Sequence, residues 1–247
     1  MDYINILGVH VSKVNMNDAV KKAEELLEKD GLSMIFTPNS EIILYASNNP
    51  EYTDVLNKAD MIIPDGIGVV YGAKILGEKL EERVAGYDLV VKFFDVLAKK
   101  GKSVYLLGAK PGVAETAAEK LTEKYPGLKI AGIHDGYFKE EEDDKIIEEI
   151  NKTSPDFLMV CLGFPKQENW IYKHRDKLNA RLAIGAGGCI DVFAGNVQRA
   201  PEFYCKHGIE WLYRLIKQPS RFVRMLALPK FGLKVLFKGK KYQKKES

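Results

Sequence analysis

The chain has 247 residues, of which 46% are hydrophobic and 29% charged, and its formal net charge is +3. A chain of this length and composition can bury a sizeable core as a soluble globular protein. Its three cysteines are an odd number without CxxC spacing, which argues against a disulfide framework or a zinc site and indicates a reducing compartment. No stretch approaches the ~20 apolar residues of a membrane span, and Asp2 stands where a signal peptide is positively charged, so we expect a cytoplasmic protein.

The small net charge hides an uneven distribution along the chain. Residues 201–247 contain 12 Lys and Arg against 3 Asp and Glu, which leaves 25 basic and 31 acidic residues in the remainder. An acidic body with a basic tail indicates that the tail meets something anionic. The sequence changes character after Gly195, so we expect a body at 1–195 and a basic, amphipathic C-terminal appendage at 196–247.

Short apolar runs typical of buried strands alternate along the body with longer segments of helical periodicity. A first strand is expected at 4–11, and Asn17 is expected to cap a helix at 18–29. The elements expected after it are, in order, a strand at 33–38, helices at 40–48 and 50–59, a strand at 60–64, helices at 65–76 and 88–100, a strand and glycine turn at 103–112, a helix at 113–125, a strand and turn at 128–138, a helix at 140–152, a strand at 156–163, a helix at 165–178 and a strand at 181–188. This alternation indicates an α/β domain with a mostly parallel sheet flanked by helices.

Polar residues gather at the carboxyl ends of these predicted strands, where a parallel α/β sheet binds its ligand. Thr37 and Asn39 follow the second strand in the run TPNSE. They present polar groups at the sheet edge, but Asn39 is also typical of a helix N-cap. The sequence alone leaves both interpretations open.

The third strand leads into PDGIG, which places Asp65 in a glycine turn. A dinucleotide-binding fingerprint would need a glycine at position 71, where the chain has Tyr71. Asp65 could cap the following helix, or it could act as a general base at a strand end.

Arg83 and Gly108 are candidates for phosphate binding. Arg83 stands just before a helix in ERVAGYD, and arginine binds phosphates bidentately, although a surface salt bridge would also explain it. Gly108 lies in LLGAKPG, a strand, glycine turn and helix. Such a turn lets backbone amides meet a phosphate, and it also occurs for structural reasons alone.

Two later strand ends carry further candidates. In GFPKQENW, Gly163 ends a strand and Pro165 takes the favoured first position of a helix. Lys166 and Gln167 lie in its first turn, where an amide and a cation suit a pyrophosphate or a sugar. In GAGGCID, Asp191 follows three glycines, and it could bind ribose hydroxyls or cap a tight turn.

The tail interleaves basic and apolar residues. Arg214 precedes a break at Pro219, and Arg221 and Arg224 follow it, among residues such as Trp211. This mixture suits an amphipathic segment at an anionic lipid surface. A helix docked on the core with a solvated face, and nucleic-acid binding, are the alternatives.

These motifs stand in a fixed order: TPNSE, PDGIG, RVAGYD, YLLGAKPG, GFPKQE, GAGGCIDVFAG with RAP, EWLYRL and PSRFVR. The series resembles the WecG/TagA/CpsF family of bacterial glycosyltransferases across nearly the whole chain. Within that family the sequence is most similar to the TagA (TarA) group, the N-acetylmannosaminyltransferases of wall teichoic acid synthesis.

The resemblance implies a Rossmann-like fold and an inverting reaction that needs no metal and no cofactor. N-acetylmannosamine would move from UDP-N-acetylmannosamine to N-acetylglucosaminyl-diphospho-undecaprenol, with a β-1,4 linkage formed and UDP released. In agreement, the acidic run at 140–144 is expected as the solvated start of a helix rather than as a metal motif.

The resemblance also implies roles for the candidate residues. Asp65 would be the base that deprotonates the acceptor hydroxyl. The residues expected to orient the sugars are Thr37, Asn39 and Gln167, and those expected to neutralise the diphosphate are Arg83, Arg214, Arg221 and Arg224. The donor is expected to meet Gly108, Tyr137, Gly163, Lys166, Gly187 and Asp191. The tail would close over the site and attach the protein to the inner face of the plasma membrane.

Other functions remain compatible with the sequence. Relatives use N-acetylmannosaminuronate or hexoses with similar motifs, so the donor sugar stays open. A nicotinamide dehydrogenase and a non-catalytic protein that binds nucleotide or anionic lipid are the rivals from other classes. We expect no nucleic-acid partner, and self-association through the apolar tail is possible.

Overall fold

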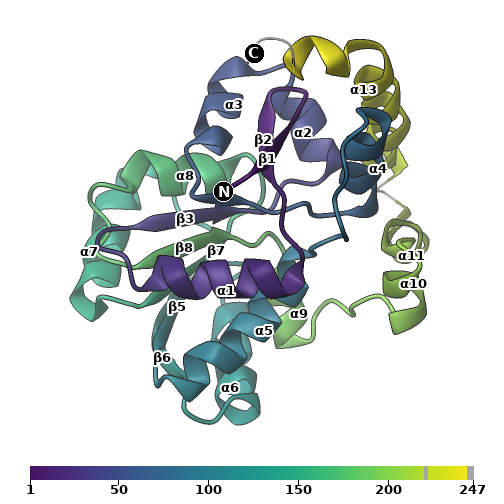
Figure 1. Cartoon of the computed structure of the whole chain (residues 1–247). Coiled ribbons are helices and arrows are strands. Elements are labelled where there is room, and N and C mark those ends of the chain that lie inside the picture. Colours follow the sequence, from purple (N-terminus) through teal and green to yellow (C-terminus); the bar gives the residue numbers. More distant parts are fainter. Residues whose placement is uncertain (220–221, 244–247) are drawn as a thin grey trace.

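The structure, a computed structural model, describes residues 1–219 and 222–243. One six-stranded sheet with helices on both faces forms the body, and the C-terminal helices lie along one side of it (Figure 1). Across the sheet the strands are β4 (Met61–Ile62), β3 (Ser33–Phe36), β8 (Leu182–Gly185), β7 (Phe157–Cys161), β5 (Ser103–Gly108) and β6 (Lys129–His134). Every pairing within it is parallel, which confirms the predicted α/β fold.

Two hydrophobic layers sandwich this sheet. One face is covered by α1 (Met16–Leu27), α5 (Gly86–Lys99), α6 (Val113–Lys124) and α9 (Cys189–Ala194). The other is covered by α2 (Ser40–Ala46), α3 (Pro50–Asn57), α4 (Ile67–Ile75), α7 (Asp143–Thr153) and α8 (Lys166–His174), and the short 3-10 helix η1 (Glu140–Glu142) precedes α7 without burying a residue. The central strand β7 shows why its sequence is wholly apolar: Leu158 and Val160 face one layer, and Phe157 and Met159 face the other.

The first predicted strand, 4–11, is wrong as a single element. The chain forms an antiparallel hairpin of β1 (Tyr3–Ile6) and β2 (Val9–Ser12), which pair only with each other among the described strands. The two residues between them, Leu7 and Gly8, have φ of 55° and 99°, as a tight hairpin turn requires. Leucine rarely adopts this conformation, so the sequence carries no hairpin signal here.

Two predicted helix starts are also corrected. The first helix begins at Met16 and is capped by Asn15, not by Asn17: Asn15 accepts from the Asp18 amide, and Asp18 accepts from the Asn15 amide. This reciprocal capping box satisfies two amides that a helix start leaves unpaired. Pro165 is the N-cap of α8 rather than its first helical residue.

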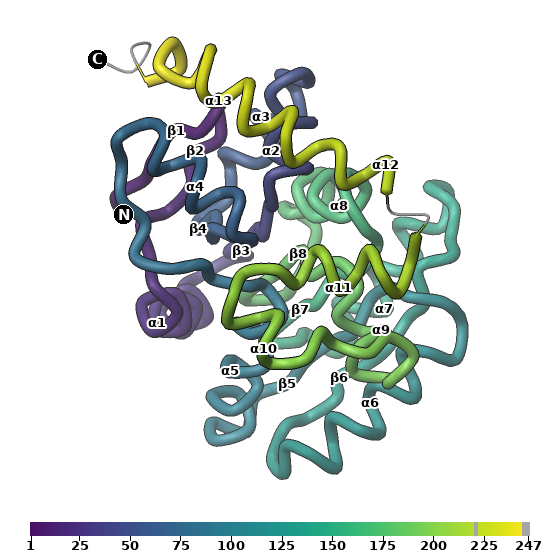
Figure 2. The backbone as a smooth tube through the Cα atoms, turned by 90° about the vertical axis from the view of Figure 1, so that its right-hand side faces the viewer, coloured from purple at the N-terminus to yellow at the C-terminus, as the bar shows by residue number. Residues whose placement is uncertain are grey.

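The tail folds into α10 (Glu202–Lys206), α11 (Glu210–Lys217), α12 (Phe222–Met225) and α13 (Ala227–Gln243). Figure 2 shows α13 running along α2 and α4, against which it packs. Phe231 and Val235 of α13 are buried in the core of the body, and Gly72 of α4 leaves room for the Phe231 ring. Within the described ranges, no helix is long and apolar enough to cross a membrane.

Candidate active site

The carboxyl ends of β7 and β8 are joined by one side chain, that of Gln167. Its Oε1 accepts from the Gly163 amide at 3.2 Å and from the Gly187 amide at 3.0 Å, and its Nε2 donates to Glu168 at 2.8 Å. A Cβ on Gly185 would come within 3.0 Å of that Nε2, so the strand end must be glycine for this approach. Gln167 is buried, and it therefore shapes the two glycine turns that edge the site.

Thr37 and Asn39 lie at the neighbouring end of β3. The buried Thr37 hydroxyl donates to the Gly185 carbonyl at 2.9 Å, which links β3 to β8 at the rim of the sheet. Asn39 accepts from the Glu41 and Ile42 amides at 2.9 and 3.1 Å. The N-cap interpretation of Asn39 is thus confirmed, and contact with a sugar stays a prediction.

Asp65 follows β4, and the structure excludes the capping interpretation for it. Helix α4 begins at Ile67 with Gly66, at φ 87°, as N-cap, and no side chain caps it. The Asp65 carboxylate instead accepts from the Gly86 amide. Burial and the nearby Glu210 charge raise the pKa of Asp65 to about 6, against the opposing effect of Arg83 and other arginine charge. A half-buried carboxyl at a strand end, with a pKa close to neutral, suits proton transfer.

Arg83 connects this strand end to the tail. Its guanidinium lies 3.0 Å from Glu210 of α11 and 3.9 Å from Asp88 of α5, and only 15% of its side chain is exposed. Glu210 also forms an ion pair with Arg214 in the next turn of α11. The salt-bridge interpretation of Arg83 is therefore correct, but the bridge is partly buried and crosses from body to tail beside Asp65.

A hollow of about 500 Å³ opens beside this charge cluster. It is lined by Arg83, Asp88, Arg199, Ala200, Glu202, Cys205 and Lys206. Asp88 is shared by Arg83 and Arg199, and the Arg199 guanidinium also stacks over the Tyr87 ring at 4.6 Å. Three basic residues, Arg83, Arg199 and Lys206, line the hollow together with the carboxylates of Asp88 and Glu202, and the arginines could bind an anionic group there.

Comparison with known proteins identifies the family. A model of the glycosyl transferase WecG/TagA/CpsF family matches residues 4–245. The chain belongs to this family. It is 42% identical over 210 residues, 85% of this chain and 81% of the relative, to the N-acetylglucosaminyldiphosphoundecaprenol N-acetyl-beta-D-mannosaminyltransferase of Bacillus spizizenii.

Proteins with the same name give similar matches. The Bacillus subtilis protein is 41% identical over 204 residues, 83% of this chain and 79% of the relative. A Staphylococcus aureus protein is 33% identical over 243 residues, 98% of this chain and 95% of the relative.

In this WecG/TagA/CpsF glycosyltransferase, Gly108 and Tyr137 lie at the ends of β5 and β6. A Cβ on Gly108 would lie 2.4 Å from the Cys161 carbonyl oxygen, so close strand packing explains this glycine. Tyr137 is 70% exposed and follows a turn that Asp135 stabilises by accepting from the Tyr137 amide. Contact of either residue with donor stays a prediction.

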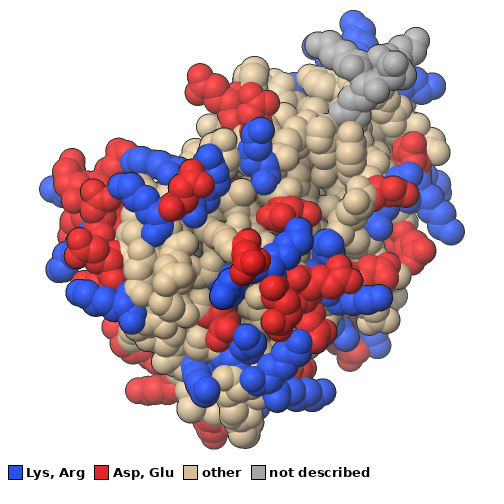
Figure 3. All heavy atoms as spheres, turned by 60° about the vertical axis from the view of Figure 1, so that its left-hand side comes forward, with Lys and Arg blue, Asp and Glu red and all other residues tan. Residues whose placement is uncertain are grey.

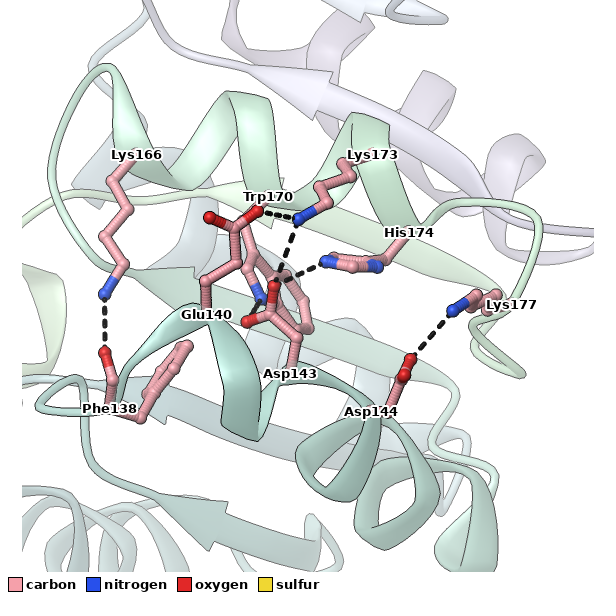
Figure 4. A network of polar contacts seen from close by, with 9 residues as sticks. All are labelled: Phe138, Glu140, Asp143, Asp144, Lys166, Trp170, Lys173, His174 and Lys177. Carbon is pink, nitrogen blue, oxygen red and sulfur yellow. Dashed lines mark hydrogen bonds and ion pairs between the residues drawn. The ribbon is translucent and has the colours of Figure 1, made fainter.

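Lys166 and Asp191 stand at helix starts. Lys166 points its Nζ over the Phe138 ring at 4.2 Å and toward the Phe138 carbonyl at 3.5 Å (Figure 4). Asp191 lies in the first turn of α9, and its backbone carbonyl accepts from the Asn196 and Val197 amides. These contacts hold the loops, and they leave the Asp191 carboxylate as a candidate for ribose.

The far half of α8 is fixed by a buried carboxylate. Asp143, expected as part of a solvated acidic run, is in fact only 6% exposed. It accepts from Trp170 Nε1 at 2.9 Å, and its other oxygen lies 2.9 Å from His174 Nε2 (Figure 4). The expected solvation of the run is thus wrong at Asp143, because two aromatic side chains of α8 supply its hydrogen bonds.

Of the two remaining tail arginines, Arg224 and Arg221, the structure describes only Arg224. Arg224 pairs with Glu41 of α2 through Nε at 2.9 Å and Nη2 at 3.1 Å. Arg221 lies outside the described residues. Arg224 therefore ties α12 to the helix that Asn39 caps, close to the ends of the sheet.

Sequence reasoning missed three members of the charge cluster: Glu210, Asp88 and Arg199. Glu210 carried a signal, because an acidic residue in a basic tail, four residues before Arg214, predicts a helical ion pair. Nothing in the sequence brings Asp88 and Arg199 together, since more than a hundred residues separate them.

The surface charges away from the Arg83–Glu210 cluster are mixed in sign. Figure 3 shows acidic and basic side chains interspersed over the face that it presents. Within the part of the chain that the structure describes, no group of three or more His, Cys, Asp or Glu residues is arranged to hold a metal ion. Metal independence stays a prediction.

Proposed function

We propose that this glycosyltransferase moves N-acetylmannosamine from UDP-N-acetylmannosamine to N-acetylglucosaminyl-diphospho-undecaprenol, forming the linkage unit of wall teichoic acid. The observation that carries the proposal is Asp65: a carboxyl with a pKa of about 6 that does not cap the following helix α4 and lies beside two arginines. Relatives at 33–42% identity bear the name of this reaction.

Asp65 performs the proton transfer. Its ionised carboxylate takes the proton from the acceptor 4-hydroxyl while that oxygen attacks C1 of the donor sugar. The new C1–O bond forms as the bond from C1 to the diphosphate breaks, so the configuration at C1 is inverted and UDP leaves with the bonding electron pair. With a pKa near 6 the carboxylate is mostly ionised at pH 7.

Arg83 and Arg214 stabilise the departing diphosphate. Both guanidiniums lie at the edge where Asp65 faces the tail, and both already bind one carboxylate, that of Glu210. A guanidinium that binds a carboxylate offers the same paired donors to a phosphate. Charge neutralisation at the leaving group lowers the barrier most when the donors are held in advance.

Thr37, Asn39 and Gln167 keep the sugar site in shape. The hydrogen bonds of Thr37 and Gln167 join the ends of β3, β7 and β8, and Asn39 fixes the start of α2, so the sugars meet a rim of fixed geometry. The donor nucleoside lies along the glycine turns that follow these strands, with Asp191 binding the ribose.

The tail attaches the protein to the cytoplasmic face of the membrane that holds the acceptor. Its helices expose large apolar side chains, namely Phe222, Val223, Leu233, Leu236 and Phe237, next to basic residues such as Lys238. Because Phe231 and Val235 of the same helix are buried in the body, α13 presents its opposite side outward. Apolar groups among lysines suit an anionic bilayer surface.

The test is UDP release from UDP-N-acetylmannosamine, with and without a lipid-diphospho-N-acetylglucosamine acceptor, in the presence of EDTA. Release that depends on acceptor and persists in EDTA supports the transferase and its metal independence. Release only from another UDP-sugar would refute the donor and favour a different transferase of the same family.

Membrane attachment is tested separately by sedimentation with vesicles. The wild-type chain should sediment with phosphatidylglycerol vesicles and not with phosphatidylcholine vesicles at the same salt concentration. The double variant Leu236→Ser/Phe237→Ser should lose this binding, and the body variant Tyr3→Ser, which also removes an exposed large side chain, should keep it. Equal binding by all three proteins would refute the tail surface.

A further inference from the structure

Glu210, the first residue of α11, lies between an arginine of the body and an arginine of the tail. Its Oε2 is 3.0 Å from Arg83 Nη1, and its Oε1 pairs with an Arg214 nitrogen. The Glu210 and Arg83 side chains are 13% and 15% exposed, which makes this contact more enclosed than two other ion pairs between appendage and body, Arg199 with Asp88 and Arg224 with Glu41.

A carboxylate in this position must be ionised to hold two guanidiniums. Burial pushes the pKa of Glu210 upward, but the charges and hydrogen bonds of Arg214 and Arg83 outweigh it and leave the pKa below its ordinary value. Two partners of opposite charge also offset the desolvation that a buried ion suffers. Glu210 therefore stays negative throughout the neutral range.

The same carboxylate lies beside Asp65. The charged groups that act on Asp65 are Glu210, Arg83 and Arg214, and the buried thiol of Cys189 lies near it too. Burial raises the pKa of the Cys189 thiol well above its ordinary value, so that neighbour is neutral at pH 7. Of these neighbours, Glu210 disfavours ionisation of Asp65, and the two arginines favour it.

We propose that Glu210 is a positioning residue that holds Arg83 and Arg214 on one carboxylate and thereby seats α11, with both arginine charges, beside Asp65. The catalytic consequence rests on the proposed function, and the placement itself does not. Two effects follow from one group: the tail docks with its arginine aimed at the leaving-group side, and the base keeps a pKa near 6.

Three changes after Glu210→Gln act on Asp65 in the same direction. The like charge disappears, the arginines become free to approach Asp65, and looser docking of α11 would hydrate the site. Each of these stabilises the ionised form, so the pKa of Asp65 must fall, by roughly one pH unit. Arg214→Gln has the opposite sign, because it removes a positive charge, and Arg214 is about half exposed, so the fold should tolerate its loss.

The decisive experiment titrates the Asp65 carboxyl by NMR in the full chain labelled with 13C-aspartate, with Asp65→Asn to assign the signal. The expected pKa order is Glu210→Gln lowest, wild type intermediate and Arg214→Gln highest. The titration curve of Glu123→Gln, which removes the same charge from an exposed position on α6, should superimpose on that of wild type. Superposition of the Glu210→Gln titration curve on that of wild type would overturn the proposal. Should Glu210→Gln not fold, the Arg214→Gln titration decides alone, since an unchanged pKa there would also overturn it.

Kinetic measurements then separate the effect of the Glu210 charge from the effect of how Glu210 positions the two arginines. In Glu210→Gln the acid limb of the kcat/KM profile should move to lower pH by the same amount as the NMR pKa. Glu210→Asp keeps the like charge but is one methylene too short to reach both guanidiniums, so its acid limb should move less than that of Glu210→Gln, while kcat falls by on the order of 10- to 100-fold. A Glu210→Asp enzyme with wild-type kcat would overturn the positioning role. A wild-type chain without transfer activity would refute the proposed function, and the NMR order would still decide the placement of Glu210.

Discussion

Two carboxylates of this glycosyltransferase, Asp143 and Asp65, lie in partly or fully buried clusters, and they differ in the hydrogen bonds and charges that surround them. Asp143 is bound by Trp170 and His174 on its two oxygens, with Lys173 at 3.5 Å. Asp65 receives one backbone amide and faces the like charge of Glu210. Side chains of α8 supply hydrogen bonds to both oxygens of Asp143. The ionised form of Asp65, in contrast, is disfavoured by burial and by the charge of Glu210. This difference indicates a structural role for Asp143 and supports the proposed role of Asp65 in proton transfer.

The two clusters also connect different parts of the chain. The Asp143 cluster joins neighbouring helices, α7 and α8, on one face of the sheet (Figure 4). The Asp65 cluster joins the body to the tail, which reaches it from more than a hundred residues away. Docking of the tail can therefore affect Asp65 directly, and it has no comparable contact with Asp143 among the described residues.

The largest expected effect is on turnover. Asp65→Asn should lower kcat by about 10²- to 10⁴-fold, because the acceptor hydroxyl loses its base. Circular dichroism and UDP binding should remain as in wild type. Asp143→Asn is the matched change in the other cluster, and its kcat per folded molecule should stay within a few-fold of wild type. Wild-type turnover by Asp65→Asn would contradict the assignment of the base.

The next effect is on stability and has the reverse pattern. Asp143→Ala should lower the free energy of unfolding by about 3–5 kcal/mol, because Trp170, His174 and Lys173 lose a buried acceptor. Urea unfolding followed by tryptophan fluorescence measures this loss. A change below about 1 kcal/mol would show that the cluster is not a structural anchor.

Asp65→Asn should also stabilise the protein, and only at neutral and higher pH. Because the folded pKa is raised from 3.8 to about 6, the stability contributed by this carboxyl is full below pH 4 and is lost as pH rises through 6. The variant should thus exceed wild type by up to roughly 3 kcal/mol at pH 8, with the gap closing toward pH 4. Thermal unfolding at several pH values checks this, and a constant gap would contradict the raised pKa.

The smallest effect is expected at the exposed ion pair between Arg224 and Glu41. Arg224→Gln should change the free energy of unfolding by less than about 1 kcal/mol, because solvent screens the pair. If Arg224 binds the diphosphate, the KM for the donor should nevertheless rise. An unchanged KM would remove Arg224 from the proposed substrate contacts.

The sequence predicts the fold well where periodicity is strong. The buried strands and long helices of the body were expected in their observed order, because apolar runs and amphipathic periods are local properties. The hairpin at β1 and β2 was missed, since its turn places Leu7 at positive φ without a turn sequence. The cap at Asn15 was misplaced because Asn15 and Asn17 both precede the helical period, and the capping-box partner of Asn15, Asp18, was not used to choose between them.

The sequence predicted which residues lie at the candidate site, but not which of them contact one another. The strand-end motifs placed Thr37, Asn39, Asp65 and Gln167 at one edge of the sheet, as observed. The sequence could not show that Gln167 is buried or that Asp65 faces Glu210, because both facts depend on contacts between distant segments. The buried Asp143 was missed for the same reason: its partners lie on another helix.

The most direct test of this account is the pH dependence of kcat/KM for transfer of N-acetylmannosamine by the wild-type enzyme and by Asp143→Asn. The free enzyme's base determines the acid limb of this profile. Both enzymes should lose activity as pH falls through about 6, the pKa of Asp65. A wild-type profile that stays flat through pH 6, or a limb that moves in Asp143→Asn, would contradict the assignment of the chemistry to Asp65.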